Sequence, residues 1–216
     1  KKPTNNAPIM IVAGEASADL HGAELVEEIN RRYPALPTFG AGGQQMRNKG
    51  FDAIIPAESM SLAGLTEVLL ALPRMLYSMR KLIRAAARRQ PSVVVLIDLP
   101  DFNLRLAKRL KPLGIPIVYY ISPQLWAWHS SRARQISRDV DILLSIFPFE
   151  KEWYAKRVPG FPVEFVGHPL CDRYADLEFR DPKSINEPRR LLLLPGSRTK
   201  ELSRHLPIMV DAAKLI

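Results

Sequence analysis

The 216 residues of this chain are enough for one large domain, or for one domain and part of another. Apolar residues make up 47% of the sequence, which is ample for a packed core, and the single cysteine, Cys171, excludes an intrachain disulfide. The net charge of +9 favours an anionic partner, such as nucleic acid, a phosphorylated metabolite or an acidic membrane surface.

Short apolar runs rich in β-branched residues alternate along the chain with helical patterns. The runs lie at 9–13, 93–97, 116–121, 142–146, 163–166 and 191–194, and the helical patterns lie at 18–32, 72–89, 104–113, 131–138 and 148–157. Most runs are continuously apolar, which is typical of strands buried on both faces. This order predicts βαβ units and therefore an α/β fold, with a parallel sheet flanked by helices.

The first apolar run ends in Gly14-Glu-Ala-Ser-Ala-Asp19, directly before a helical pattern. Ligands bind outside the carboxyl ends of the strands in open parallel sheets, and a helix start can hold an anion. Gly14, Glu15 and Ser17 are therefore candidate ligand contacts. The alternative is that Ser17 and Asp19 cap the helix and Glu15 is a solvated loop residue. The segment lacks the GxGxxG pattern, so dinucleotide binding is not indicated.

The Leu-rich stretch 61–77 is followed by a basic one, with no acidic residue between Glu67 and Asp98. An apolar stretch beside a basic helix indicates a face that binds a lipid or a membrane surface. The candidate membrane and acyl-chain contacts are Leu62, Leu65, Val68, Leu69, Leu72, Arg74, Met75, Leu76, Arg80, Lys81 and Arg84. The alternative is an ordinary amphipathic helix with solvated charges. Nucleic acid is not expected, because no aromatic residues are interleaved with the basic ones.

Two carboxylates lie three residues apart in Asp98-Leu-Pro-Asp-Phe-Asn103, after the run at 93–97. A carboxylate that is partly desolvated at the mouth of a crevice can act as a general base toward a hydroxyl. Asp101 lies farther into the loop and can point at a ligand, whereas Asp98 is nearer the strand and is expected to be structural. The alternative is that Asp101 and Asn103 cap the following helix.

The run at 116–121 leads into Ser122-Pro-Gln-Leu-Trp-Ala-Trp-His129. Trp126 and Trp128, together with Ser122 and Gln124, can form an apolar wall with hydrogen-bonding groups, which suits a sugar or an acyl chain. Each tryptophan by itself can instead be a core residue beside a turn. The four histidines of the chain do not have the spacing of metal ligands, so no metal site is predicted.

Residues 176–190 are charged, contain Pro182 and Pro188 and lack apolar periodicity, which predicts a linker. The apolar run after it leads into Pro195-Gly-Ser-Arg198 and a helix start, as at the beginning of a second α/β domain. A glycine turn, a hydroxyl and an arginine at a helix start suit a phosphate, and the alternative is a tight turn with a surface arginine. The last helical stretch has no residue that ends a helix, which predicts that the chain is a fragment.

Segments distributed in order along nearly all of the chain together resemble the lipid-A-disaccharide synthase family. They are Gly14-Glu-Ala-Ser17, Gly40-Ala-Gly-Gly43, Pro100-Asp-Phe-Asn103, Ser122-Pro-Gln-Leu-Trp-Ala-Trp128, Phe147-Pro-Phe-Glu-Lys151, Phe165-Val-Gly-His-Pro169 and Leu194-Pro-Gly-Ser-Arg-Thr-Lys-Glu201. Each segment is a weak signal, but the ordered set is specific. Ala18 departs from the usual pattern, which has glycine there, and a methyl group is unfavourable if that position needs a positive φ.

The resemblance implies a GT-B glycosyltransferase of family 19 with two Rossmann-like domains. It implies an acceptor-binding domain at 1–175, a linker at 176–189 and the beginning of a nucleotide-sugar-binding domain at 190–216. The implied reaction joins UDP-2,3-diacylglucosamine to 2,3-diacylglucosamine 1-phosphate by inverting direct displacement, which releases UDP and forms a β-1,6 disaccharide, a lipid A precursor. No cofactor is implied, and the fragment alone is expected to be inactive and to bind UDP poorly.

The resemblance also implies roles for particular residues. Asp101 is the candidate base toward the acceptor 6-hydroxyl, and Gly196, Ser197 and Arg198 are the candidate nucleotide contacts. The candidate substrate contacts are Gly14, Glu15, Ser17, Asp98, Asn103, Ser122, Gln124, Trp126 and Trp128. The lipid-binding face implies a peripheral protein on the cytoplasmic side of the inner membrane, and a homodimer is possible. Two alternatives stay open: an enzyme like UDP-N-acetylglucosamine 2-epimerase, and a non-catalytic membrane-surface binding module.

Overall fold

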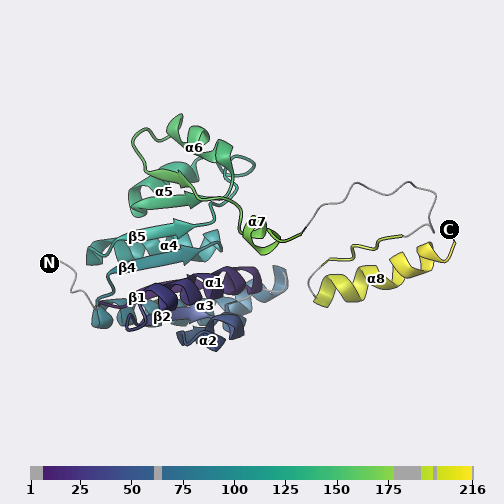
Figure 1. The fold of residues 1–216 in the computed structure, drawn as a ribbon, viewed down its shortest axis with the longest axis horizontal. Coiled ribbons are helices and arrows are strands. Elements are labelled where there is room, and N and C mark those ends of the chain that lie inside the picture. Colours follow the sequence, from purple (N-terminus) through teal and green to yellow (C-terminus); the bar gives the residue numbers. More distant parts are fainter. Residues whose placement is uncertain (1–6, 61–64, 178–190, 197–198, 216) are drawn as a thin grey trace. The chain divides into compact units, whose positions relative to one another are not determined.

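The computed structural model describes residues 7–60, 65–177, 191–196 and 199–215, with the side chains of 65–71 and 199–200 left out (Figure 1). The strands are β1 (Ile9–Ala13), β2 (Thr38–Gly42), β3 (Asp52–Pro56), β4 (Val93–Ile97), β5 (Ile117–Tyr120), β6 (Ile142–Ser145) and β7 (Val163–Phe165). The helices are α1 (Ala16–Arg32), α2 (Gln44–Asn48), α3 (Leu65–Arg89), α4 (Pro100–Leu110), α5 (Arg132–Asp139), α6 (Pro148–Ala155), α7 (Pro169–Arg173) and α8 (Thr199–Ala213). Short 3₁₀ turns follow β3 and α4, at Ala57–Ser59 and Lys111–Leu113.

The described strands form one parallel sheet in the order β3-β2-β1-β4-β5-β6-β7, which confirms the predicted α/β class. Every neighbouring pair is parallel. Figure 1 shows the central strands as adjacent arrows from β2 through β1 and β4 to β5. The strand order reverses between β1 and β4, and such a switch point is where open α/β sheets bind ligands.

Two cores lie on opposite faces of the sheet, because successive strand residues point to opposite sides. Val94 and Leu96 of β4 belong to the core that includes residues of α3, α4 and α5. Val95 and Ile97 belong to the core that includes residues of α1 and α2. Both faces of the central strands are thus covered, which explains why their sequences are apolar without alternation.

Several element boundaries differ from the sequence-based expectation. β2 and β3 were not expected, because Thr38-Phe-Gly-Ala-Gly42 contains two glycines, which are poor strand formers. Gly40 is required there: its φ is +144°, and a Cβ atom would lie 2.0 Å from the Ile11 carbonyl oxygen. The expected strand at 191–194 is wrong. No described segment pairs with these residues, and a strand needs a partner for its backbone hydrogen bonds.

The helices that follow β1, β3 and β4 all begin earlier than expected. α1 begins at Ala16, α3 at Leu65 and α4 at Pro100, where proline is well tolerated because a first-turn N–H needs no helical partner. The prediction that Ser17 caps α1 is therefore wrong, because Ser17 lies inside the first turn. The chain divides into two compact units, at 1–173 and 174–216, and α8 belongs to the second. In the described part of the chain, no helix is long and apolar enough to span a membrane.

Candidate functional site

The turn after β4 has an unusual backbone that the surrounding residues hold in place. Asp98 and Leu99 both have positive φ, 49° and 46°, which costs a non-glycine residue about 1–2 kcal/mol each. The buried Asn103 amide donates hydrogen bonds to the carbonyl oxygens of Ile97 at 3.1 Å and Asp98 at 2.8 Å. The hydroxyl of Tyr119 donates a third bond, of 2.6 Å, to the Asp98 carbonyl oxygen. The turn is thus fixed from two elements, α4 and β5.

The side chain of Asn103 takes part in this packing. Its side chain has no exposed surface, and its Nδ2 group is already bonded to the turn. Asn103 therefore supports the turn from inside, and its contact with substrate stays a prediction. The reason for this burial is the early start of α4, which turns Asn103 into the core instead of leaving it in a loop.

The loop after β1 lies directly against the turn after β4. A Cβ atom on Gly14 would lie 2.5 Å from Leu99 Cδ2, so a larger residue there would displace the end of the Leu99 side chain. Glu15 and Ser17 follow at the start of α1, half-buried and exposed respectively. Ala18 is buried in α1 and is not among the residues with positive φ, so its methyl group fits without backbone strain.

The prediction that Asp19 caps α1 is also wrong, because Asp19 binds the start of α2 instead. It accepts hydrogen bonds from the backbone N–H groups of Gly43 at 2.7 Å, Gln45 at 2.9 Å and Met46 at 3.2 Å. Side-chain oxygens satisfy such unpaired N–H groups at a helix start. These hydrogen bonds thus connect α1, which follows β1, to the loop after β2, at the carboxyl ends of the two strands.

The two carboxylates of the β4 loop have different environments. Asp98 is half-buried, and burial raises the pKa of its carboxyl, while the Leu99 backbone N–H and nearby His21 lower it to a smaller degree. The Asp101 side chain is 73% exposed, and its Oδ1 lies 2.9 Å from Nη1 of Arg132. Sequence reasoning expected Asp98 to be structural. The structure gives Asp98 the partial desolvation that was expected of a catalytic carboxylate.

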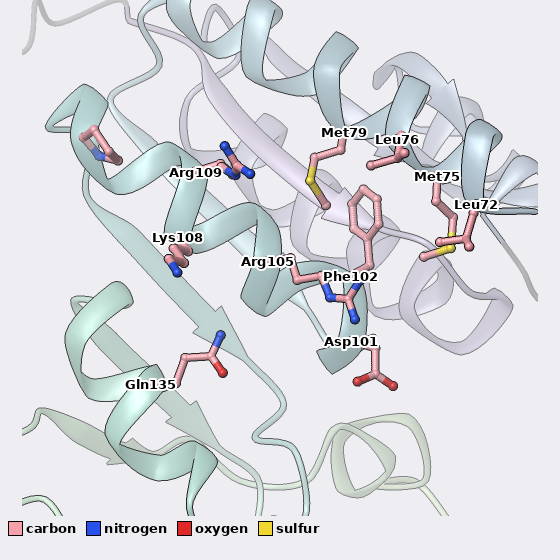
Figure 2. A pocket seen from close by; sticks show the side chains of 11 residues that line it. Leu72, Met75, Leu76, Met79, Asp101, Phe102, Arg105, Lys108, Arg109 and Gln135 are labelled. Atoms are coloured by element: carbon pink, nitrogen blue, oxygen red, sulfur yellow. The ribbon is translucent and has the colours of Figure 1, made fainter. Parts of the chain in front are cut away.

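A groove of about 1160 Å³ lies between α3 and α4. Leu72, Met75, Leu76 and Met79 form its α3 wall, and Phe102 points toward them from α4 (Figure 2). The polar lining residues are Asp101, Arg105, Lys108, Arg109 and Gln135. The groove combines an apolar wall, a carboxylate and several cations, which is the composition that an amphiphilic ligand with a charged group needs.

The predicted membrane and acyl-chain residues divide between two sides of α3. Leu72, Met75 and Leu76 line the groove, whereas Arg80, Lys81 and Arg84 line a separate basic hollow with Tyr77. Arg74 is exposed and lines neither. Leu62 lies outside the described residues, as do the side chains of Leu65, Val68 and Leu69.

The loop after β5 is attached to α6 by a buried carboxylate. Glu150 has no exposed surface; its Oε1 accepts a hydrogen bond of 3.2 Å from Trp126 Nε1, and its Oε2 lies 2.5 Å from Ser145 Oγ. The Trp126 ring packs edge-on against Phe149, with 5.3 Å between the ring centroids. The motif Phe147-Pro-Phe-Glu-Lys151 includes Glu150, but the sequence predicted no role for this residue. Glu150 begins the charged run Glu150-Lys-Glu152, so no local signal in the sequence distinguished it from a solvated residue.

The other predicted residues of this loop differ in exposure. Trp126 is 42% exposed and Trp128 74% exposed, and Gln124 is also exposed, so all three can reach a ligand. Ser122 is buried, and its hydroxyl lies 3.2 Å from that of Tyr154, so it packs inside the loop, and its contact with substrate stays a prediction.

The second unit carries the predicted phosphate-binding turn only in part. Gly196 is described and has a φ of +105°, a conformation that glycine adopts without strain. Ser197 and Arg198 lie outside the described residues. Within the ranges that the structure covers, no cluster of three or more His, Cys, Asp or Glu side chains could hold a metal ion.

The sheet order and the switch point together define a Rossmann-like domain. Two solved structures have a similar fold. A putative UDP-N-acetylglucosamine 2-epimerase from Listeria monocytogenes gives a TM-score of 0.55 at 13% identity, covering 79% of this chain and 51% of that one. The UDP-GlcNAc 2-epimerase from Neisseria meningitidis gives a TM-score of 0.56 at 11% identity, covering 78% and 48%. At these identities the likeness concerns the fold alone.

The sequence comparisons establish the family. The model of the lipid-A-disaccharide synthetase family matches residues 9–216, and the chain belongs to this family. The lipid-A-disaccharide synthase of Anaeromyxobacter dehalogenans strain 2CP-C is 50% identical over 210 residues, covering 95% of this chain and 54% of that protein. That of Myxococcus xanthus strain DK1622 is 45% identical over 216 residues, covering 98% and 56%. The chain thus spans about half the length of the curated relatives it matches.

Proposed function

We propose that this chain is the acceptor-binding part of a lipid-A-disaccharide synthase. The proposed reaction joins UDP-2,3-diacylglucosamine to 2,3-diacylglucosamine 1-phosphate. The observation that carries this proposal is the α3–α4 groove, because its apolar wall and charged lining suit an acylated sugar phosphate. Family membership supports the same activity. An epimerase that acts on a soluble sugar nucleotide has no use for an apolar groove of this size.

In this proposal the acyl chains of the acceptor lie along Leu72, Met75, Leu76 and Met79. The sugar then lies toward the turn after β4, near the carboxylates of Asp98 and Asp101. Asp98 takes the proton of the acceptor 6-hydroxyl while that oxygen forms a bond to the anomeric carbon of the donor. The bond from this carbon to the UDP oxygen breaks on the opposite face, so the configuration inverts and UDP leaves.

The choice of Asp98 as the base rests on its environment. A catalytic base needs a pKa raised toward the working pH, and burial raises that of Asp98. The strained turn also fixes the position of Asp98, since three hydrogen bonds from Asn103 and Tyr119 hold it. Asp101, paired with Arg132 at the groove, orients the acceptor sugar.

The donor side of the proposal rests on sequence motifs and exposed aromatic residues. Trp126 and Trp128 provide apolar faces for a sugar, with Gln124 as a hydrogen-bonding group. Arg198, together with Gly196 and Ser197, stabilises the charge that develops on the diphosphate of UDP. The exposed apolar and basic residues of α3 hold the protein on the cytoplasmic surface of the inner membrane.

The test is a glycosyl-transfer assay on the full-length parent protein in detergent, with both acylated substrates. Replacing a general base costs about 10²- to 10⁴-fold in rate, so Asp98→Asn is expected to lose that much kcat while the acceptor KM changes little. Asp101→Asn is expected to lose less than about tenfold. Asp52→Asn, which changes an exposed aspartate paired with Arg89, is the matched control.

Each outcome decides one part of the proposal. A larger loss of kcat from Asp101→Asn than from Asp98→Asn would show that Asp101, and not Asp98, is the general base. If the folded wild-type protein forms no disaccharide, the proposed reaction is wrong.

A further inference from the structure

Helix α4 presents three cations to the α3–α4 groove. Arg105, Lys108 and Arg109 are spaced at i, i+3 and i+4, which places them on one side of a helix. All three are exposed, and all three line the groove. Figure 2 shows Arg105 and Arg109 on the α4 side, across from the apolar wall of α3.

No carboxylate neutralises these three cations in the part of the chain that the structure describes. The carboxylate of the groove, Asp101, forms its ion pair with Arg132 instead. Many other cations of the fold do have acidic partners. These pairs include Arg31–Glu28, Arg47–Glu58, Lys49–Glu27 and Lys111–Asp141. The groove therefore has an excess of positive charge next to an apolar wall.

Helix stability alone does not account for this arrangement. Lys108 and Arg109 lie in the last turn of α4, where the helix dipole favours cations. Arg105 lies a turn earlier, and like charges at i and i+4 are unfavourable in a helix by about 0.2–0.5 kcal/mol. An anion bound between the side chains would remove this repulsion. Arginine is suited to this purpose, because its guanidinium can form two parallel hydrogen bonds with a phosphate.

We propose that Arg105, Lys108 and Arg109 form the recognition site for a phosphate monoester on an acylated ligand whose chains lie along the α3 wall. A monoester carries up to two negative charges and three terminal oxygens, which three cations can match, whereas a phosphodiester carries one charge. This inference rests on the proposed function, in which the ligand is the acylated acceptor sugar. It adds the three side chains with which the enzyme selects an acceptor that carries a phosphate.

The position of the site also orients the ligand. Asp101 and Arg105 are four residues apart on α4, which is about 6 Å along the helix axis. A sugar with its phosphate on the three cations then has its opposite end near the turn that carries Asp98. The phosphate and the reacting hydroxyl are therefore held at two ends of one groove.

The site can be tested by binding, without turnover. The full 216-residue chain is titrated by calorimetry with dihexanoyl phosphatidic acid, a phosphate monoester with two short acyl chains, kept monomeric. The comparison ligands are dihexanoyl phosphatidylcholine, a diester, and inorganic phosphate. The variants are Arg105→Gln with Arg109→Gln, and the control is Arg31→Gln with Arg32→Gln, which removes the same charge from the last turn of α1, outside the groove.

The expected result is monoester binding that the groove double variant weakens at least tenfold and the control double variant weakens less than twofold. The diester and inorganic phosphate should both bind at least tenfold more weakly than the monoester. Restoring the charges with Arg105→Lys and Arg109→Lys should recover part of the affinity. Equal losses in the two double variants, or equal binding of monoester and diester, would overturn the proposal, since attraction by net charge alone would explain them.

Two further measurements separate this site from membrane binding and from the proposed reaction. If the groove variant loses binding to vesicles of anionic phospholipid but keeps full affinity for the monomeric monoester, the cations serve the membrane and the inference is wrong. In the full-length enzyme, the groove variant should raise the acceptor KM more than it lowers kcat. An unchanged KM would refute the site and leave the transferase function intact. Groove-dependent monoester binding without any transfer would refute the function and leave the site intact.

Discussion

Glu150 is expected to stabilise the folded chain when its own carboxyl group is protonated and therefore uncharged. Ser145 has one hydroxyl proton but two acceptors, the Phe147 carbonyl oxygen at 2.8 Å and Glu150 Oε2 at 2.5 Å. The carbonyl oxygen can only accept, so both contacts are satisfied when the carboxyl of Glu150 carries a proton. Burial raises the pKa of Glu150, although hydrogen bonds from Ser145, Ser122 and Trp126 partly lower it. Both observations favour the protonated form.

The size of the effect follows from these contacts. Glu150→Ala leaves the Trp126 N–H and the Ser145 hydroxyl without one partner each, at about 1 kcal/mol apiece, and leaves a cavity that costs about 1–2 kcal/mol more. The expected loss in the free energy of unfolding is therefore about 3–4 kcal/mol. Glu150→Gln keeps an acceptor for Trp126 and offers an N–H to Ser145, so its loss at acidic pH is about 1 kcal/mol or less.

The pH dependence gives a sharper test than the magnitude. Because the folded-state pKa of Glu150 lies above the ordinary value of 4.5, the folded protein binds more protons than the unfolded chain just above pH 4.5. The stabilisation is complete below pH 4.5 and is lost as the pH rises through the folded-state pKa. Glutamine does not titrate, so the stability of Glu150→Gln relative to wild type should increase as the pH rises from 4.5.

The assay is urea unfolding of the chain at pH 4.5 and at pH 7, followed by far-ultraviolet circular dichroism. Glu152→Gln is the matched control on the same helix, because Glu152 is exposed and solvent weakens its ion pair with Lys156. The reasoning fails if Glu150→Gln is as damaging as Glu150→Ala. It also fails if the difference between Glu150→Gln and wild type is the same at both pH values.

Three substitutions test the edge of the sheet by urea unfolding. Asn103→Ala removes the bonds that hold the strained Asp98 turn and should cost about 2–3 kcal/mol, and a loss below 1 kcal/mol would mean that Tyr119 alone holds it. Asp19→Ala should cost about 2 kcal/mol, because the start of α2 loses its cap, and an unchanged midpoint would contradict that role. Ala18→Gly should destabilise α1 by about 1 kcal/mol, whereas stabilisation would show that the methyl group is strained.

Local patterns in the sequence were enough to predict the class of fold. Continuous apolar runs such as 93–97 alternate with helical patterns, and this order leads directly to a parallel sheet covered on both faces. The pattern failed at β2, where glycine is needed for the close approach to β1. Gly40 serves a contact between strands that lie far apart in the sequence, and propensity does not register such contacts.

The sequence also supplied most pieces of the candidate site, but as separate segments. Leu72 and Leu76 were predicted as lipid contacts, and Asp101 as a reacting group. Only the packing of α3 against α4 brings these residues into one groove and adds Arg105 and Arg109 to it. In the sequence, those two arginines resemble the solvated face of any amphipathic helix.

Burial was the property that the sequence determined least. Asn103 and Ser122 follow strands, where ligand contacts are common, yet both are buried, and half-buried Asp98 has a raised pKa. Glu150 has no exposed surface at all. Apolar periodicity is a local property, so the sequence alone determined the α/β class and five of the described strands, β1, β4, β5, β6 and β7. The desolvation of a polar side chain depends on what distant segments place around it, and only the tertiary structure decided that.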